Sequence, residues 1–163
     1  MTTLRQHTID SPLGALRLIG SDAGLRAVWW PVERTGRVVF DEEPVDGEHP
    51  ILIRAAQQLD EYIAGDRTDF DVPLDLVGTD FQRAVWTGLQ MIPFGETRSY
   101  GDLAADIERP GAARAVGSAT GRNPISIIIP CHRLVGASGS LTGFAGGVES
   151  KRWLLDHETQ RLF

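Results

Sequence analysis

Hydrophobic and polar residues alternate in three short segments near the start of the chain, at residues 4–9, 15–19 and 25–30. Alternation with a period of two is typical of strands that bury one face. The segments between them, 11–14 and 21–24, are rich in Ser, Pro, Asp and Gly, which favour turns. The pattern therefore predicts a small antiparallel sheet of three strands.

A single helix is predicted after this sheet. Residues 31–49 are rich in charge, Pro and Gly, and we interpret them as a variable loop. Pro50 suits the first turn of a helix, and Gly65 suits its end. The apolar residues between them recur at helical spacing: Leu52, Ala55, Ala56, Leu59, Tyr62 and Ile63. Residues 66–78 are expected to form a strand and a linker.

The second half of the chain is helical in pattern, and the boundary in the linker gives domains at 1–77 and 78–163. Thr79 and Gln82 have the spacing of a capping box, and Ser99 can cap a second helix over 100–107. A third helix, at about 112–120, follows the break at Arg109-Pro110-Gly111. Two short helices joined by such a break resemble a helix-turn-helix. The predicted fold class is α+β, with a small N-terminal α/β domain and a helical C-terminal domain.

The third helix consists mostly of small residues. Its one long charged side chain is Arg114, and the small residues are Ala112, Ala113, Ala115, Gly117, Ser118 and Ala119. Such a helix favours one of two arrangements. Either its backbone packs closely against another helix, or it lies in a narrow groove of DNA with Arg114 as its one inserted side chain.

The charge of the chain is unevenly distributed. The net charge is −6, and residues 1–78 hold seven Arg against 14 Asp and Glu. Residues 79–163 hold nine Lys and Arg against eight acidic residues. This balance excludes a polybasic clamp for nucleic acid, but the second half leaves room for a local DNA-binding patch.

The cellular compartment is inferred from the single cysteine and the lack of long apolar runs. One cysteine excludes a disulfide framework and a four-cysteine zinc site, and a free thiol suits a reducing cytoplasm. No apolar run is long enough to span a bilayer, and the first residues do not form a signal peptide. We expect a cytoplasmic protein that makes no contact with a membrane.

That cysteine, Cys131, precedes a histidine and follows the apolar run at 127–129 and Pro130. A thiol is mostly protonated at neutral pH, so a nucleophilic cysteine needs a nearby base such as His132. Pro130 has a fixed φ and lacks an N–H, which predicts a rigid corner at the end of a strand. The alternative is that Cys131 is a small buried apolar residue that happens to precede a histidine.

Motifs along the second half resemble those of the O6-alkylguanine-DNA alkyltransferases, also called methylated-DNA–protein-cysteine methyltransferases. The resemblance covers residues 79–163 and involves motifs in the family's order. They are Pro93-Phe94-Gly95-Glu96-Thr97, Ser99-Tyr100, Ala112-Ala113-Arg114-Ala115-Val116-Gly117, Asn123-Pro124, Pro130-Cys131-His132-Arg133, Gly136-Ala137-Ser138-Gly139, Gly146-Gly147, Trp153-Leu154-Leu155 and Glu158. The first half resembles the family's N-terminal domain only in length and pattern.

The resemblance implies a fold and an activity. The C-terminal domain would be winged-helix-like and would bind duplex DNA through the minor groove, as a monomer, with cooperativity on DNA left open. The protein would flip an O6-alkylated guanine into a pocket and move the alkyl group irreversibly to Cys131, once per molecule. O4-alkylthymine is a second candidate lesion. No cofactor is implied. Some members bind zinc through N-terminal cysteines, which this chain lacks, so we expect no metal.

The resemblance also implies roles for individual residues. Cys131 would be the nucleophile, His132 the base acting through a water, and Glu158 the group that orients His132. Asn123 would brace the turn that carries the cysteine, and Tyr100 would donate a hydrogen bond to the purine or its phosphate. Arg114 would replace the flipped base in the stack. The remaining DNA-facing residues would be Ala112, Ala113 and Ser118, and the substrate pocket would comprise Ser138, Phe144, Ala145 and Gly146.

The chain departs from the family pattern at two pocket positions, and other functions remain open. Phe144 and Ala145 stand where many members carry Tyr and Ser, which removes two hydroxyl groups. A cysteine hydrolase would also use Cys131 and His132, whereas a helix-turn-helix regulator would bind DNA without transfer. A zinc nucleobase deaminase needs a second cysteine where this chain has Leu134. Related proteins that bind alkylated guanine without transfer lack the cysteine.

Overall fold

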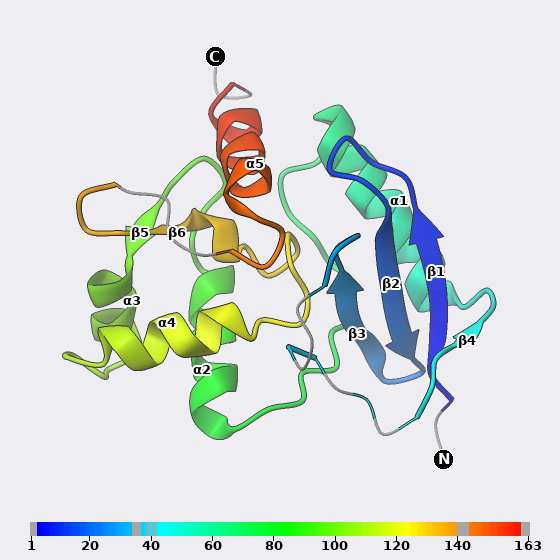
Figure 1. Ribbon diagram of the computed structural model, residues 1–163, viewed down its shortest axis with the longest axis horizontal. Helices are drawn as coiled ribbons and strands as arrows, with labels where there is room; N and C mark the ends of the chain where they lie inside the picture. Colours follow the sequence, from blue (N-terminus) through cyan, green and yellow to red (C-terminus); the bar gives the residue numbers. More distant parts are fainter. Residues whose placement is uncertain (1–2, 34–36, 39, 41, 140–143, 161–163) are drawn as a thin grey trace. The chain divides into compact units, whose positions relative to one another are not determined.

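The computed structural model describes the chain except for residues 1–2, 34–36, 39, 41, 140–143 and 161–163. The chain divides into two units, Met1–Val77 and Gly78–Phe163. A four-stranded sheet and a two-stranded sheet are formed in the described residues (Figure 1). The first sheet belongs to the first unit and the second sheet to the second unit.

The first unit is a sheet with one helix. Its strands run in the order β3-β2-β1-β4, and the β1–β2 and β2–β3 pairs are antiparallel, which confirms the three predicted strands. The fourth strand was not expected, because it consists of two residues in the charged segment interpreted as a loop. It pairs parallel to β1, so the sheet has four strands rather than three. The elements are β1 (Arg5–Ile9), β2 (Leu16–Ser21), β3 (Gly24–Trp29), β4 (Val45–Asp46) and α1 (Pro50–Ala64).

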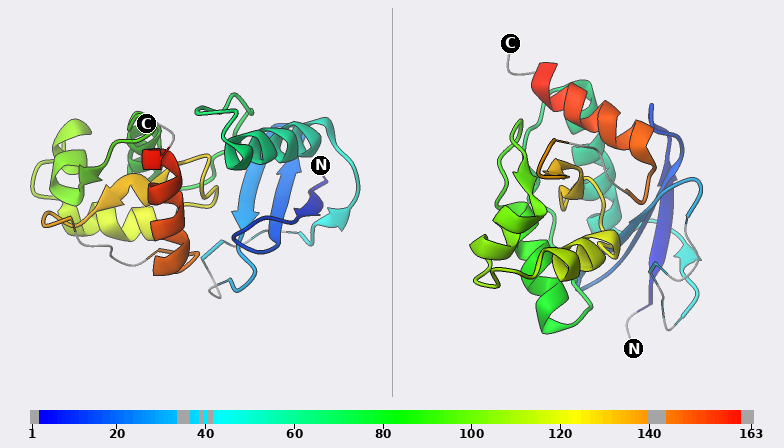
Figure 2. Two further views of the ribbon diagram at one scale, coloured as in Figure 1. Left: turned by 90° about the horizontal axis from the view of Figure 1, so that it is seen from above. Right: turned by 60° about the vertical axis from the view of Figure 1, so that its left-hand side comes forward.

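Helix α1 lies across one face of this sheet (Figure 2). Pro50 occupies its first turn, and Gly65 ends it with a φ of 88°, as predicted. The helix cap comes from His49, whose ring accepts a hydrogen bond from the N–H of Ile51 at 3.1 Å. The residues of α1 that are buried include four of the predicted apolar set: Leu52, Ala55, Leu59 and Tyr62.

The strand expected within 66–78 does not form. Only Leu74 makes a bridge, which is parallel to Leu25. The N–H of Leu25 donates to the carbonyl of Pro73 at 2.8 Å, and the N–H of Asp75 donates to the carbonyl of Leu25 at 2.9 Å. Proline has no N–H to extend the ladder, so the pairing remains a single bridge.

The second unit is built mainly from helices. Thr79 and Gln82 form the predicted capping box of α2, and Ser99 caps α3 through the N–H of Asp102 at 3.1 Å. Strands β5 and β6 pair in parallel. The elements are α2 (Asp80–Gln90), β5 (Arg98–Ser99), α3 (Tyr100–Asp106), α4 (Ala113–Gly121), the 3-10 helix η1 (Cys131–Arg133), β6 (Leu134–Val135) and α5 (Val148–Gln160).

Helices α2, α3 and α4 pack against one another, and α3 and α4 form the predicted helix-turn-helix (Figure 1). A Cβ atom at Gly88 of α2 would lie 2.9 Å from side-chain atoms of Leu103 and Ile107, so glycine permits this close approach. The indole of Trp86 donates to the carbonyl of Ala119 at 2.9 Å. Val116 and Ala119 of α4 are buried, so one face of this small-residue helix packs inside the unit, as one of the two interpretations requires.

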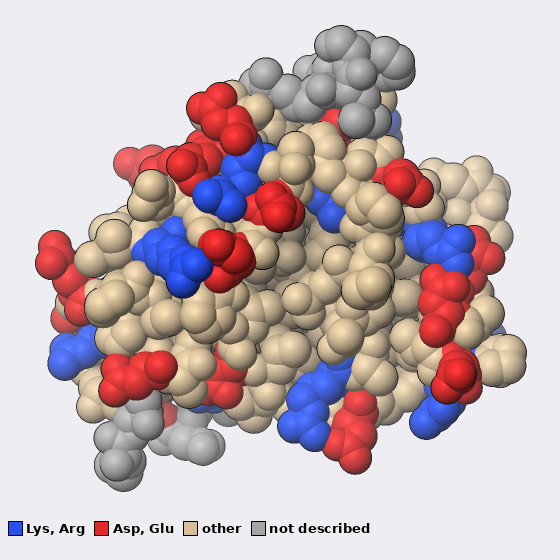
Figure 3. Space-filling view, turned by 180° about the vertical axis from the view of Figure 1, so that it is seen from behind, with Lys and Arg blue, Asp and Glu red and all other residues tan. Residues whose placement is uncertain are grey.

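Acidic and basic side chains lie side by side over the face shown in Figure 3. Ion pairs within the two units include Arg54–Asp71 in the first and Arg98–Asp106 in the second. Within the part of the chain that the structure describes, no helix has both the length and the apolar character to cross a bilayer.

Candidate active site

A pair of tight turns carries the chain to Cys131, in place of the strand that the sequence predicted. The N–H of Ile128 donates to the carbonyl of Ser126 at 2.9 Å, around Ile127 with a φ of 73°. The N–H of Cys131 donates to the carbonyl of Ile129 at 2.7 Å, around Pro130. Positive φ is rare for a β-branched residue, and it interrupts the extended backbone that a strand needs.

Asn123 spans these turns from inside the unit. Its Nδ2 donates to the carbonyl of Ile129 at 2.9 Å, and its Oδ1 accepts from the N–H of Ile125 at 3.0 Å. The side chain is almost fully buried. Because it satisfies one donor and one acceptor on opposite sides of the turn, it fixes the backbone just before the cysteine.

Cys131 and His132 are both buried, at the start of η1. The Nε2 atom of His132 lies 2.8 Å from Oε2 of Glu158. Burial lowers the pKa of His132, although the neighbouring carboxylate of Glu158 acts in the opposite direction. A neutral ring that donates Nε2–H to Glu158 leaves its Nδ1 as an acceptor, and Nδ1 has no hydrogen-bond partner among the described residues.

Glu158, on α5, is shared between His132 and Arg133. The Nε and Nη2 atoms of Arg133 donate to Oε1 and Oε2 of Glu158, both at 2.9 Å. Burial alone would raise the pKa of Glu158, but the hydrogen bonds from His132 and Arg133 outweigh it and hold the pKa well below its usual range. Glu158 is therefore a carboxylate at neutral pH.

Lys151 is a further buried charged group at this site. Its Nζ donates to the carbonyl of Leu134 at 2.6 Å. Burial lowers the pKa of Lys151, while negative charge at Cys131 opposes that shift, so the ammonium and the sulfur influence each other. Sequence reasoning missed Lys151, and it quoted Arg133 within the motif at 130–133 without giving it a role. The sequence does single out Lys151, because it is the only lysine among the 16 Lys and Arg residues.

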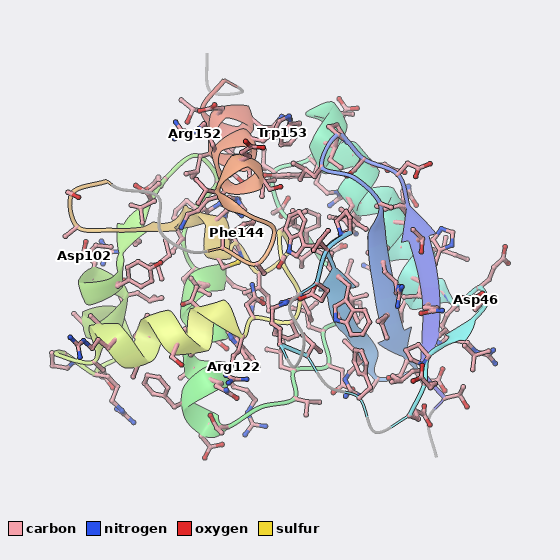
Figure 4. All side chains as sticks on the ribbon, in the orientation of Figure 1. Asp46, Asp102, Arg122, Phe144, Arg152 and Trp153 are labelled. Carbon is pink, nitrogen blue, oxygen red and sulfur yellow. The ribbon has the colours of Figure 1, made fainter. Side chains whose placement is uncertain are left out.

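The predicted DNA-facing residues lie on the helix-turn-helix. Tyr100 begins α3, and its ring packs against α4, since a Cβ at Gly117 would lie 3.6 Å from it. Arg114 and Ser118 are exposed on α4, one turn apart, whereas Ala112 and Ala113 are half-buried at its start. Arg122, which sequence reasoning missed, continues this exposed row at the end of α4 (Figure 4).

The predicted pocket residues lie on the loop between β6 and α5. Phe144, Ala145 and Gly146 are half-buried and lead into α5 (Figure 4), whereas Ser138 is exposed. The N–H of Gly147 donates to the carbonyl of Phe144 at 2.9 Å, which closes the turn before the helix. Residues 140–143 of this loop lie outside the described part of the chain. Among the residues that are described, no three His, Cys, Asp or Glu side chains gather to hold a metal ion.

Comparison with known protein families agrees with this arrangement. The 6-O-methylguanine DNA methyltransferase ribonuclease-like domain matches residues 4–76, and the DNA binding domain of the same family matches residues 80–160. The methylated-DNA–protein-cysteine methyltransferase of Mycolicibacterium paratuberculosis is 50% identical over 157 residues. That match covers 93% of this chain and 90% of the relative.

Solved structures give the same result. The crystal structure of Mycobacterium tuberculosis OGT in complex with DNA is 50% identical, with a TM-score of 0.83, and the match covers 98% of this chain and 94% of that chain. The O6-methylguanine-DNA methyltransferase of Pyrococcus kodakaraensis, at 23% identity and a TM-score of 0.71, shares the fold over 96% of this chain and 99% of its own. The chain therefore belongs to the 6-O-methylguanine DNA methyltransferase family.

Proposed function

We propose that this protein repairs DNA by moving an alkyl group from the O6 atom of guanine to Sγ of Cys131. The observation that supports it most directly is the buried series Cys131, His132 and Glu158. In this series, Glu158 accepts from Nε2 of His132 at 2.8 Å, and Nδ1 of His132 remains an acceptor. A base next to a lone buried thiol is what nucleophilic sulfur chemistry requires.

The reaction balances without a cofactor. The thiol proton passes to Nδ1 of His132, through a water, and the thiolate attacks the alkyl carbon. The S–C bond forms as the C–O6 bond breaks, and the guanine leaves with the electron pair and takes up a proton from solvent. His132 returns the thiol proton to solvent, so the protons balance. Because the thioether formed on Cys131 is stable, each molecule accepts one alkyl group and acts once.

Helix α4 supplies the DNA contacts in this proposal. Arg114, Ser118 and Arg122 are spaced four residues apart and share an exposed face. Ala112 stands at the N-cap without a side-chain hydrogen bond, so first-turn amides can meet a phosphate. Arg114 would hold the gap left when the lesion base is flipped out through the minor groove. We infer a monomer, and O4-alkylthymine is a second candidate substrate.

Two further features support a poised thiolate and an apolar pocket. The ammonium of Lys151 would stabilise negative charge on Cys131, as cationic neighbours do for reactive cysteines. Phe144 keeps an apolar wall for a flipped base. Because Phe144 and Ala145 lack hydroxyl groups, hydrogen bonds to O6 would come from backbone N–H groups of the loop or from Tyr100.

One experiment tests the proposal. The protein is mixed with duplex DNA that contains O6-methylguanine, and the peptide that holds Cys131 is weighed. We expect a gain of one methylene unit, with at most one alkyl group per protein. Cys131→Ser should abolish transfer and keep binding to the alkylated duplex.

The alternative functions predict different results from the same mixture. A cysteine hydrolase would turn over many substrate molecules and leave the mass of Cys131 unchanged at the end. A helix-turn-helix regulator would bind a preferred DNA sequence without any change at Cys131. Transfer that persists in Cys131→Ser would contradict the proposed nucleophile.

A further inference from the structure

Arg133 is buried beside His132, although alkyl transfer gives it no direct part. Its guanidinium makes a two-pronged contact with Glu158, through Nε to Oε1 and Nη2 to Oε2, both at 2.9 Å. Paired hydrogen bonds of this kind fix the plane of a carboxylate as well as its position. Oε2 is the same oxygen that accepts from Nε2 of His132.

The other end of Arg133 is anchored to the turn after α2. Its Nη1 donates to the carbonyl of Ile92 at 2.6 Å, and its guanidinium carbon lies 5.8 Å from the centre of the Phe94 ring. The N–H of Gly95 in the same turn points to Oε1 of Glu158 at 3.4 Å. The turn at 92–95 therefore anchors Arg133, and it also contacts Glu158 directly.

We propose that Arg133 is a positioning residue, which holds Glu158 as an oriented carboxylate so that His132 stays neutral with Nδ1 as the proton acceptor. This inference rests on the proposed function, because it concerns the base of that reaction. Arg133 and Glu158 cancel each other's charge, so a neutral His132 adds no further charge to the buried cluster. Without Arg133, the buried carboxylate would lose its paired guanidinium, and an imidazolium at His132 would become its direct ionic partner. The Nδ1 of an imidazolium carries a proton and cannot accept one.

The charges around His132 agree with this role. Burial is the main cause that lowers the pKa of His132, and the positive charges of Arg133 and Lys151 lower it further. Only Glu158 acts to raise it. Arg133 therefore favours the neutral ring of His132 in two ways. Its positive charge repels an imidazolium directly, and its hydrogen bonds to Glu158 neutralise the carboxylate that would otherwise stabilise the imidazolium.

The test compares Arg133→Met, which removes the charge and the fork, with Arg133→Lys, which keeps the charge. Arg98→Met is the matched control, since Arg98 forms an exposed ion pair with Asp106 in the same unit. The main measurement is the ring ¹⁵N chemical shift of His132 against pH, assigned among the four histidines with His132→Gln. The second measurement is the rate of transfer from free O6-benzylguanine between pH 5.5 and 8.5.

We expect wild-type, Arg133→Lys and Arg98→Met proteins to keep His132 neutral, with Nε2 protonated, at pH 6. In Arg133→Met the midpoint of His132 protonation should rise by about one pH unit or more. Its transfer rate should fall more at pH 6 than at pH 8. Arg133→Lys should lose rate equally at all pH values, because the fork is lost but the charge remains.

Several results would overturn the inference. A uniform loss of rate in Arg133→Met, with an unchanged His132 midpoint, would give Arg133 a purely structural role. If Arg133→Met fails to fold, wild-type protein still decides, since an imidazolium at pH 6 contradicts the inference. The ¹⁵N measurement does not depend on transfer, so a wild-type protein that transfers no alkyl group would overturn the proposed function and leave this inference to be judged separately.

Discussion

Lys151 is the one lysine of the chain. Every other basic residue in the chain is an arginine, and Lys151 is buried with its Nζ at 2.6 Å from the carbonyl of Leu134. An ammonium is a compact charge on a flexible stem, whereas a guanidinium is larger and planar. Burial lowers the pKa of Lys151, and negative charge at Cys131 acts against that shift.

We expect Lys151→Met to slow the reaction of Cys131 with iodoacetamide at pH 7 by about tenfold, the effect of losing about 1.4 kcal/mol of thiolate stabilisation. Removing the buried charge should raise stability, whereas leaving the carbonyl of Leu134 without its donor should lower it. The two effects oppose each other, so the unfolding midpoint should change little. Lys151→Arg is the companion variant, and crowding at this buried position should lower its unfolding midpoint. A Lys151→Met protein with wild-type alkylation kinetics would remove Lys151 from the mechanism.

Arg114 is expected to act on base extrusion rather than on the chemistry at sulfur. It is exposed on the second residue of α4 and lies on another element than Cys131. Arg114→Ala should therefore slow transfer from an O6-methylguanine duplex far more than transfer from free O6-benzylguanine, which needs no flipping. Single-turnover rates on both substrates give the comparison. Equal losses on the two would mean that Arg114 supports the fold instead.

The sequence allowed some site residues to be predicted and not others. Cys131, His132 and Glu158 belong to motifs whose order along the chain marks the family, and the structure places His132 and Glu158 in contact. The contacts of Arg133 and Lys151 depend on residues 17 to 41 positions away, such as Ile92 and Leu134. No local pattern encodes such partners, so their part in the site required the fold.

At the scale of helices, two glycines give a matched test of packing. A Cβ at Gly117 of α4 would meet the Tyr100 ring at 3.6 Å, an ordinary contact, whereas at Gly88 of α2 it would lie 2.9 Å from Leu103 and Ile107. Gly117→Ala should raise stability by about 0.5–1 kcal/mol through helix propensity. Gly88→Ala should lower it by about 1–3 kcal/mol through overpacking. Urea unfolding measures both, and shifts of the same sign would contradict the packing described for α2 and α3.

Elements set by local signals were predicted well, and elements set by distant partners were not. The capping box at Thr79 and the end of α1 at Gly65 need only neighbouring residues. Strand β4 exists because the N–H of Val45 finds the carbonyl of Leu4 at the free edge of β1. The apolar run before Cys131 has the composition of a strand, but the chain turns at Ile127, which has a positive φ inside the turn closed by Ser126 and Ile128.

At the scale of the whole molecule, the buried ionisable groups of the site make the free energy of unfolding depend on pH. An unfolded chain protonates histidine below about pH 6.5, and the folded chain resists this at His132 because its pKa is lowered. Below about pH 4.5 the unfolded chain binds a second proton, at Glu158. The folded chain does not bind it there, because the pKa of Glu158 is also lowered by folding. The unfolded state then binds more protons, so the free energy of unfolding falls as pH falls through both ranges.

We expect the free energy of unfolding to decrease by up to about 1.4 kcal/mol per pH unit from His132 as pH falls below about 6.5, and more steeply where Glu158 adds its own contribution. Urea titrations across this range give the slope. His132→Gln should flatten the upper part of the curve. The control is His7→Gln, at an exposed position of β1, which should run parallel to wild type. Parallel curves for all three proteins would show that His132 titrates normally in the folded state.

The long separation between Glu158 and its donors has a consequence for how the protein acquires its reactivity as it folds. Glu158 lies 63 residues from Gly95, 26 from His132 and 25 from Arg133 along the chain. Contacts across such distances form slowly, because loop closure costs entropy before the contacts stabilise it. In the proposed function, a partly folded chain would thus carry an ordinary thiol, and Cys131 would become reactive only when α5 has joined η1 and the turn after α2.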